Sequence, residues 1–295
     1  MGGGVLIAIM FSKNYNDIVD IENILIAWNG FLRGKRYKKD VVVFQAKLSQ
    51  NIVSLYYDLQ NRAYKHGEYS AFNISDPKPR NIHKATVRDR LLHHIIYRQL
   101  YPYFDPRFIY DSYSCRDKKG THRALDRFKE FASRVSLNHT RTCFVLKCDV
   151  RKFFASIDQG ILIGILQKHI KDAEFILLIK EVVSSFYATA PGIGLPLGNL
   201  TSQLLVNIYM HQFDMYMKRD LRVKYYIRYA DDFVILSEDQ KYLEDLRLEI
   251  ESFLGEKLHL TLHPDKVYIK TYASGVDFLG WVHFPHHRQI RPAQA

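Results

Sequence analysis

The chain has little cysteine and no long apolar run, and both absences narrow what it can be. Its three cysteines are an odd number without the paired spacing of a metal site, which argues against a disulfide framework. No apolar stretch is long enough to span a bilayer. The short apolar run at 5–11 has no basic residue before it and makes a poor signal peptide. We therefore expect a cytoplasmic protein without a membrane partner.

Acidic residues are too few to balance the basic ones. The chain has 42 Lys and Arg against 31 Asp and Glu, a formal net charge of +11. This surplus favours a polyanionic partner, and nucleic acid fits better than a membrane because no basic amphipathic helix stands out. Charge alone also allows a merely basic surface. At 295 residues the chain has room for one large domain or two or three smaller ones.

Hydrophobic periodicity predicts a helical first half and a mixed second half. Helices are expected over about 41–66 (ending at Gly67), 86–101, from 121, within 159–187, from 199, and over 239–254 (ending at Gly255). Prolines 77 and 79 mark a break, and 110–120 is a basic loop. From residue 143 onward the order is strand, helices, strand, strand, helix, strand. This order fits a βαββαβ sheet with helices on one face, preceded by a separate basic and more helical subdomain.

Two adjacent carboxylates, Asp231 and Asp232, lie between the β-prone segments 223–228 and 233–236, with room only for a tight turn. Burying two like charges side by side is unfavourable, and a divalent cation is the usual remedy. Oxygen ligands alone suit Mg²⁺. Taken by itself, an Asp-Asp turn is more often a solvated turn.

A third carboxylate changes that balance. Asp149 ends the strand-like run 143–148, so it can converge with the Asp pair at the end of a neighbouring hairpin. Three such carboxylates can bind two Mg²⁺ ions about 3.5–4 Å apart, as in the phosphoryl transfer of polymerases and nucleases. One ion would activate a 3′-hydroxyl and the other would hold a triphosphate. Alone, Asp149 is a common strand-end residue.

A glycine-rich segment, 192–203, joins a turn to a helix start. Glycines let a backbone approach a ligand closely, and Asn199 or Thr201 can cap the helix. Free N–H groups at a helix start suit a nucleotide or a template strand. By itself, such a segment is usually only a turn.

Four segments together resemble the bacterial reverse transcriptases. They are 144–158, Gly194–Gln203, Tyr229-Ala230-Asp231-Asp232 and Phe278-Leu279-Gly280-Trp281. The likeness covers roughly 40–285 and implies an α+β right-hand polymerase. Its parts would be an N-terminal segment (1–40), helical, basic fingers (41–142), a ferredoxin-like palm (143–275, with fingers elements near 159–190), and a primer-grip hairpin with the truncated start of a thumb (276–295). The thumb would be largely missing.

The resemblance also implies roles for single residues. Asp149, Asp231 and Asp232 would be catalytic metal ligands, helped by the backbone of Val150, for two Mg²⁺ ions with Mn²⁺ as a substitute. The residues implied to bind dNTPs are Lys84, Arg90, Phe154, Gly198 and Gln203, with Phe154 selecting against a ribose 2′-hydroxyl. The residues implied to contact primer or template are Arg80, Tyr229, Lys266, Gly280 and Trp281. Without the family, Phe154 reads as a core residue, Lys84 and Arg90 as solvated helix charges, and Lys266 as a surface lysine.

The glycine-rich segment also indicates a branch of that family. Leu197 and Gln203 stand where many relatives have Gln and Pro, a variant similar to the reverse transcriptases of diversity-generating retroelements. The resemblance implies error-prone copying of an RNA template from a DNA or RNA primer, with an accessory retroelement protein as a partner. The alternatives are a retron-type or anti-phage-defence enzyme, and a non-catalytic RNA-binding scaffold.

Overall fold

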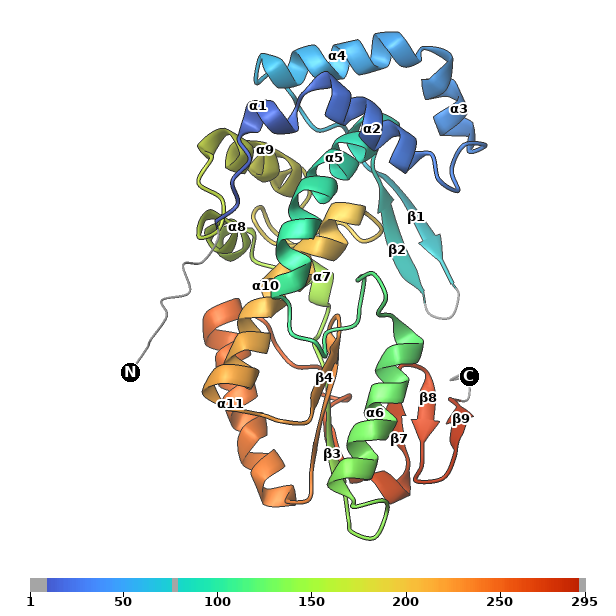
Figure 1. The fold of residues 1–295 in the computed structure, drawn as a ribbon, viewed down its shortest axis with the longest axis vertical. Helices are drawn as coiled ribbons and strands as arrows, with labels where there is room; N and C mark the ends of the chain where they lie inside the picture. Colours follow the sequence, from blue (N-terminus) through green and yellow to red (C-terminus); the bar gives the residue numbers. More distant parts are fainter. Residues whose placement is uncertain (1–9, 76–78, 292–295) are drawn as a thin grey trace. The chain divides into compact units, whose positions relative to one another are not determined.

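The computed structural model describes residues 10–75 and 79–291 (Figure 1). The chain folds into two compact units. The first unit contains 1–106 and 158–205, and the second contains 107–157 and 206–295. The chain passes from one to the other three times, the last time inside helix α10 (Leu200–Met215). Within the described ranges, no helix combines the length and hydropathy needed to cross a bilayer.

The first unit is mostly helical. Its elements are α1 (Tyr15–Ile18), α2 (Ile21–Phe31), α3 (Lys39–Ala46), α4 (Leu48–Gln60), β1 (Ser70–Ile74), β2 (Arg80–Lys84), α5 (Val87–Phe104), α8 (Gln159–Gln167), α9 (Ala173–Ser184) and the start of α10; a short 3₁₀ turn (Asp105–Arg107) follows α5. The predicted helix over 41–66 is wrong in two respects. It breaks at Lys47, where the Asn51 side chain caps the Phe44 carbonyl at 2.9 Å, and it ends at Gln60 instead of Gly67.

The antiparallel hairpin of β1 and β2 was not predicted. Its residues are exposed or half-buried, so its sequence lacks the alternation that reveals a half-buried strand. The prolines read as a break precede β2, and Pro77 lies outside the described residues.

A buried polar network joins α5 to the segment before β1. The Tyr64 hydroxyl donates to Asp89 Oδ1 at 2.7 Å, and the Nε2 atoms of His66 and His93 lie 3.2 Å apart. His93 is 1% exposed, and its Nδ1 has no hydrogen-bond partner in the described residues. Burial, followed by the neighbouring His66, lowers the pKa of His93 to about 3. His93 is therefore neutral at physiological pH.

Acid is expected to destabilise the first unit through His93. Its folded-state pKa of about 3 lies below the ordinary value of 6.5, so as the pH falls the unfolded chain takes up the proton first. The stabilisation is complete above pH 6.5 and is lost below it, by about 1.4 kcal/mol per pH unit. Denaturant unfolding at pH 7 and pH 5 should differ by about 2 kcal/mol more in the wild type than in His93→Leu. An equal difference in both proteins would contradict this account.

The second unit is built on a four-stranded antiparallel sheet. The sheet order is β4 (Tyr226–Tyr229), β5 (Asp232–Ser237), β3 (Phe144–Asp149) and β6 (Tyr268–Thr271). Helix α10 precedes β4, and α11 (Gln240–Leu258) links β5 to β6. The predicted α+β fold and βαββαβ order are confirmed. Helix α11 runs through Gly255, the predicted stop, and ends at Leu258, followed by His259 in the left-handed conformation (φ 49°).

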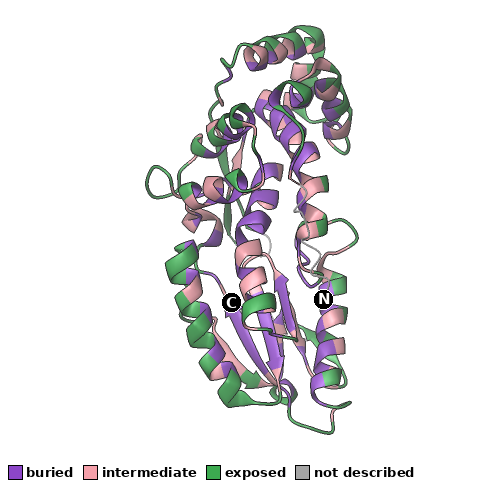
Figure 2. Ribbon diagram, turned by 60° about the vertical axis from the view of Figure 1, so that its left-hand side comes forward, coloured by how far each residue is buried: buried purple, intermediate pink, exposed green. Residues whose placement is uncertain are grey.

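Helices cover both faces of this sheet, which corrects the prediction of helices on one face (Figure 2). Val234 and Leu236 of β5 pack in the cluster of α6 (Thr121–Val135), while Phe233 lies 5.2 Å from Phe213 of α10. Successive strand residues point to opposite faces, so β5 reads as a continuous apolar run. Helix α6, predicted in a separate subdomain, belongs here because its apolar face packs against Val145 and its neighbours in that cluster.

A small second sheet follows. Its order is β7 (Val276–Phe278), β8 (Trp281–His283) and β9 (Arg288–Ile290), and the unit also contains α7 (Phe153–Ser156), a π-helical turn (Tyr216–Asp220) and a 3₁₀ turn (Tyr272–Ser274). The loop between β7 and β8 is only Leu279-Gly280, with φ of 53° and 83°. Positive φ at both positions defines a type I′ turn, whose twist matches that of antiparallel strands. Phe278 anchors this hairpin against Phe128 of α6, with ring centroids 5.4 Å apart.

Candidate active site

The three predicted carboxylates gather at one end of the four-stranded sheet. Asp149, the last residue of β3, is paired in register with Asp232, the first residue of β5. Asp231 lies in the turn before β5, and its carbonyl accepts from the backbone N–H of Val150 at 3.2 Å. Residues paired directly across antiparallel strands project from the same face. The sheet register thus brings Asp149 beside the Asp pair, as the sequence predicted.

A buried arginine holds the turn that carries the Asp pair. Ala230 has a φ of 57°, a conformation that a non-glycine residue adopts at a cost. Its carbonyl accepts from Nη1 of Arg228 at 3.0 Å. Arg228 has no exposed side chain surface, and it donates from Nε and Nη2 to Asp214 on α10 at 2.8 and 2.6 Å. Asn207 and Ser112 complete its hydrogen bonds, at 3.2 and 3.1 Å. The strained turn is therefore fastened to α10.

Two lysines contact the carboxylates. Lys266 Nζ lies 3.0 Å from Asp149 Oδ1, and Lys147 Nζ lies 2.5 Å from Asp232 Oδ1. Lys266 was predicted near the site. Lys147 was missed, although strand alternation in β3 places it on the same face as Asp149. A lysine inside an apolar strand, two residues before a candidate metal ligand, was the available signal.

The two lysines do not offset the negative charge of the three carboxylates. Burial, with the nearby Asp149 carboxylate, raises the pKa of Asp231. Burial also raises the pKa of Asp232 to about 6, against the opposing effect of Lys147. Three oxygen donors with unmet negative charge fit a hard divalent cation such as Mg²⁺. Within the described residues, no three His, Cys, Asp or Glu side chains are grouped closely enough to enclose an ion. Metal binding therefore stays a proposal.

Two of the predicted nucleotide-binding residues lie together in the first unit. Lys84 at the end of β2 and Arg90 on α5 both contact Oδ2 of Asp40, with Lys84 Nζ at 2.7 Å. Sequence reasoning missed Asp40 because nothing in the pattern pairs it with residues 44 and 50 positions away. Arg80, the first residue of β2, is exposed and pairs with Ile74.

The glycine-rich segment is fastened to β2. The Leu197 carbonyl accepts from the N–H of His83 at 3.1 Å, and the Asn199 side chain donates to the His83 carbonyl at 2.9 Å. Gly198 has a φ of 102°. Gln203 lies on the first turn of α10, where its N–H donates to the Asn199 carbonyl at 3.3 Å. The turn and the hairpin thus form one backbone-bonded piece of the first unit.

Gly198→Ala is expected to disturb this piece. A Cβ at this position would lie 2.8 Å from Ile82 Cγ2, and its positive φ is unfavourable for any L-residue. We expect a loss of about 1–3 kcal/mol in unfolding free energy. Denaturant titration tests this, with Gly34→Ala as control: Gly34 also has a positive φ (69°), but nothing lies within 4 Å of its Cβ. Equal losses in the two variants would show that the contact with Ile82 is unimportant.

The other predicted residues lie in the second unit. Phe154, on α7, is half-buried with its ring centroid 5.6 Å from that of Phe153. The Tyr229 hydroxyl accepts from Thr121 at 3.2 Å. Gly280 forms the β7–β8 turn. The guanidinium carbon of Arg288 lies over the ring of Trp281, 4.8 Å from the ring centroid. The nucleotide and primer roles of these residues stay predictions.

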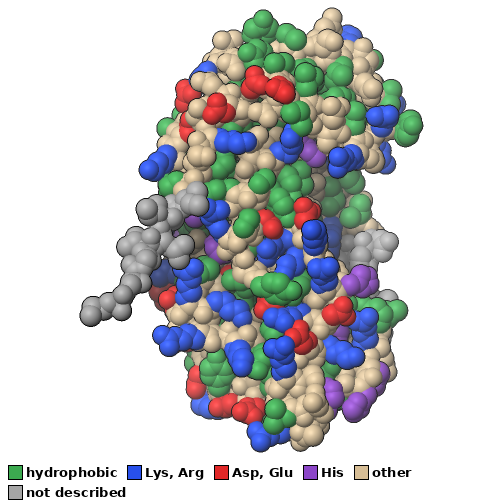
Figure 3. All heavy atoms as spheres, viewed as in Figure 1, with side chains coloured by type: hydrophobic (Ala, Val, Ile, Leu, Met, Phe, Trp, Pro, Cys, Tyr) green, Lys and Arg blue, Asp and Glu red, His purple; other side chains and the backbone are tan. Residues whose placement is uncertain are grey.

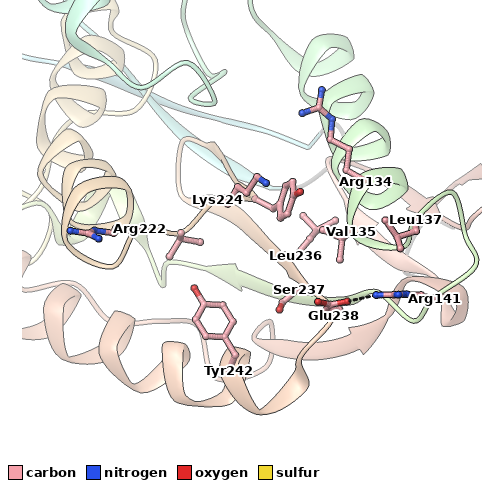
Figure 4. A pocket seen from close by; sticks show the side chains of 12 residues that line it. Arg134, Val135, Leu137, Arg141, Arg222, Lys224, Leu236, Ser237, Glu238 and Tyr242 are labelled. Carbon is pink, nitrogen blue, oxygen red and sulfur yellow. Dashed lines mark ion pairs between the residues drawn. The ribbon is translucent and has the colours of Figure 1, made fainter.

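The charges on the face in Figure 3 do not locate a site. On the face in Figure 3, Lys and Arg side chains spread over both units instead of forming one patch. A depression of 360 Å³ (Figure 4) lies at the far end of β5 from Asp232, lined by residues such as Leu236 and Tyr242. Its Arg141 and Glu238 pair with each other at 3.6 Å. The depression contains none of the predicted site residues.

A family model and two curated proteins are similar in sequence to this chain. A family model described as reverse transcriptase (RNA-dependent DNA polymerase) matches residues 71–283. The chain is 26% identical to protein YkfC of Escherichia coli over 254 residues, covering 74% of this chain and 65% of YkfC. It is 22% identical to the group II intron-encoded protein LtrA of Lactococcus lactis over 275 residues, covering 69% of this chain and 44% of LtrA.

Solved structures share the fold. A telomerase from Candida albicans, in complex with a fragment of telomeric RNA, has a TM-score of 0.56 at 11% identity, covering 84% of this chain and 51% of that one. An apo telomerase from Candida tropicalis, truncated from its C-terminal domain, has a TM-score of 0.54, also at 11% identity, covering 76% of this chain and 54% of that one. The chain spans less than two thirds of the length of the curated relatives named above. Because the family model matches well over half of its residues, this chain belongs to the reverse transcriptase family.

Proposed function

We propose that this chain is an RNA-directed DNA polymerase that extends a primer on an RNA template with dNTPs. The observation that carries the proposal is the register pairing of Asp149 with Asp232, beside Asp231, at one end of the palm-like sheet. In this assignment the sheet of the second unit is the palm and the helices of the first unit contribute the fingers. The enzyme would act in the cytoplasm.

Asp149, Asp231 and Asp232, with the backbone of Val150, would hold two Mg²⁺ ions, or Mn²⁺ in their place. When bound, the ions supply activation of the primer 3′-hydroxyl and stabilisation of the leaving pyrophosphate. The protein's own part is to hold the carboxylates ionised and in position. Lys147 does this for Asp232, and Lys266 places a positive charge at Asp149.

The remaining predicted residues would position the substrates. Lys84 and Arg90 bind the triphosphate through charge-assisted hydrogen bonds. Phe154 excludes a ribose 2′-hydroxyl by its bulk, so the enzyme prefers dNTPs. The primer and template contacts are assigned to Arg80, Tyr229, Lys266, Gly280 and Trp281, and nucleotide contacts to Gly198 and Gln203.

Primer extension tests the proposed activity. The chain, with Mg²⁺ and dNTPs, is given one primer annealed to an RNA template and to a DNA template of the same sequence. Template-directed extension on RNA supports the proposal, and a mixture lacking template serves as control. Failure to extend the primer on either template, also after addition of an accessory protein, would reject the proposed polymerase activity.

For the branch of the family, we propose an error-prone enzyme of a diversity-generating retroelement. The support is Leu197 and Gln203 in the glycine-rich segment, whose Leu197 carbonyl bonds β2. The likeness to an intron-encoded protein is the observation behind the alternative, an intron-like enzyme without this error bias. Sequencing the cDNA decides: errors concentrated at template adenines support the retroelement, and errors spread evenly over the four bases support the intron-like alternative.

A further inference from the structure

A single carboxylate oxygen lies between two cations in the first unit. Oδ2 of Asp40, the second residue of α3, contacts both Lys84 Nζ, at 2.7 Å, and Nη2 of Arg90. The Arg90 side chain is 16% exposed, and those of Asp40 and Lys84 are 34% and 40% exposed. Two converging donors on one anionic oxygen are the arrangement in which proteins bind a phosphate oxygen. Asp40 therefore occupies the point where these two cations meet.

A third cation lies beside this cluster. Lys35 Nζ and the Arg90 guanidinium carbon are each 5.2 Å from the ring centroid of Phe31. Burial, followed by the charge of Arg90, lowers the pKa of Lys35. The positive charge of Arg90 therefore acts on Lys35. Lys35 thus adds positive charge on the Arg90 side of the cluster, so the two cations that hold the Asp40 carboxylate have a third cation near them. This excess of positive charge is one that a more highly charged anion can use.

The Asp40 carboxylate can be reached from solvent, because its side chain is 34% exposed and that of Lys84 is 40% exposed. Solvent therefore screens the Asp40–Lys84 ion pair, and an anion from solution can compete with the carboxylate for the lysine. The attachment of α3 to the rest of the unit does not depend on Asp40 alone, because Val41, the next residue, is fully buried. Loss of the Asp40 contacts would therefore leave α3 in place.

We propose that Asp40 is an internal competitor for the triphosphate site: its carboxylate occupies the meeting point of Lys84 and Arg90, with Lys35 beside Arg90, until a nucleotide triphosphate displaces it. The inference rests on the proposed function and adds Lys35 and Asp40 to that site. In this arrangement Asp40 weakens nucleotide binding, since the triphosphate must first displace the carboxylate. Removing the Asp40 charge should therefore strengthen triphosphate binding.

The test is calorimetric titration of the full chain with inorganic tripolyphosphate, which contains no base or sugar. We expect the Kd of Asp40→Asn to be about tenfold lower than that of the wild type. The matched control is Asp58→Asn. Asp58 pairs with Arg88, which lies on α5 like Arg90, and the control removes one negative charge as Asp40→Asn does. Its Kd should stay within about twofold of the wild-type value. An unchanged or higher Kd in Asp40→Asn, or an equal decrease in both variants, would overturn the proposal.

Further variants test the charge of Asp40 and the part of Lys35 in the site. Lys35→Met should raise the tripolyphosphate Kd, and an unchanged Kd would remove Lys35 from the site. Asp40→Glu keeps the charge and should bind tripolyphosphate no more tightly than the wild type; tightening would overturn competition. If Asp40→Asn fails to fold, Asp40→Ser replaces it in the same titration. A single-stranded RNA titrated in parallel separates the sources of phosphate, because tightening for RNA without tightening for tripolyphosphate would contradict a triphosphate site.

This titration needs no polymerisation, so it stands apart from the test of the proposed function. A chain that never extends a primer would reject the polymerase, while the tripolyphosphate Kd would still decide the role of Asp40. If the chain does polymerise, Asp40→Asn should lower the KM for dNTP. A purely structural role would instead leave KM unchanged or raise it.

Discussion

Asp231→Asn is expected to stop nucleotide incorporation while leaving the protein at least as stable as the wild type. The carboxylate is unfavourable for folding, because burial and the neighbouring Asp149 raise the pKa of Asp231. A neutral amide of the same shape removes the repulsion and part of the burial penalty. The same change removes a negatively charged oxygen from the proposed metal site, and we expect incorporation to fall by at least about a thousandfold.

Thermal unfolding and single-nucleotide incorporation, measured on the same preparation, check this prediction. Asp232→Asn is the informative comparison, because it leaves the buried Lys147 without its partner and should therefore lower the unfolding temperature. If Asp231→Asn unfolds more than about 4 °C below the wild type, the carboxylate is structural and the account of the turn is wrong.

The largest loss of stability is expected from breaking the buried pair of Arg228 and Asp214. Neither side chain is exposed, and they share two hydrogen bonds at 2.8 and 2.6 Å. Removing one partner leaves an uncompensated buried charge, which costs about 3–5 kcal/mol. Asp214→Asn is therefore expected to lower the unfolding free energy of the second unit by about that amount, as measured by denaturant titration.

A matched control exists in the chain. Glu174 pairs with Arg62 at 2.7 Å, but their side chains are 48% and 42% exposed, so Glu174→Gln should cost at most about 1 kcal/mol. Replacing both buried partners, as in Arg228→Met with Asp214→Leu, should recover part of the loss, because no charge is then left unpaired. Equal losses from the buried and the exposed pair would contradict this account. Since Arg228 also holds the Ala230 carbonyl, the double variant should regain stability without regaining activity.

The centre of the sheet could be predicted because β3 and β5 are largely apolar runs, with Asp149 at the end of β3 and Asp232 at the start of β5. That pattern located β3, the hairpin of β4 and β5, and the pairing of Asp149 with Asp232. That helices cover both faces of the sheet could not be predicted in the same way. An apolar run such as Phe233–Leu236 indicates burial on both faces, but the sequence does not say that α6, which lies before β3, supplies the second cover.

The missed parts share a physical cause. The hairpin of β1 and β2 is exposed and has no hydrophobic period, so only its backbone pairing reveals it. Asp40, Lys147 and Arg228 act through partners far away in sequence, and charge pairing over such separations depends on the fold. Lys147 alone left a local signal, as a charged residue inside an apolar strand.

We propose that Asp149, Asp231 and Asp232 form one site for RNA-templated synthesis. The most direct measurement is incorporation of a single dNTP on an RNA template by the wild type, Asp149→Asn, Asp231→Asn and Asp232→Asn, side by side. We expect incorporation by the wild type and a loss of at least about a thousandfold in each variant. Wild-type activity that survives in any one variant, or a wild type that incorporates nothing, would contradict it.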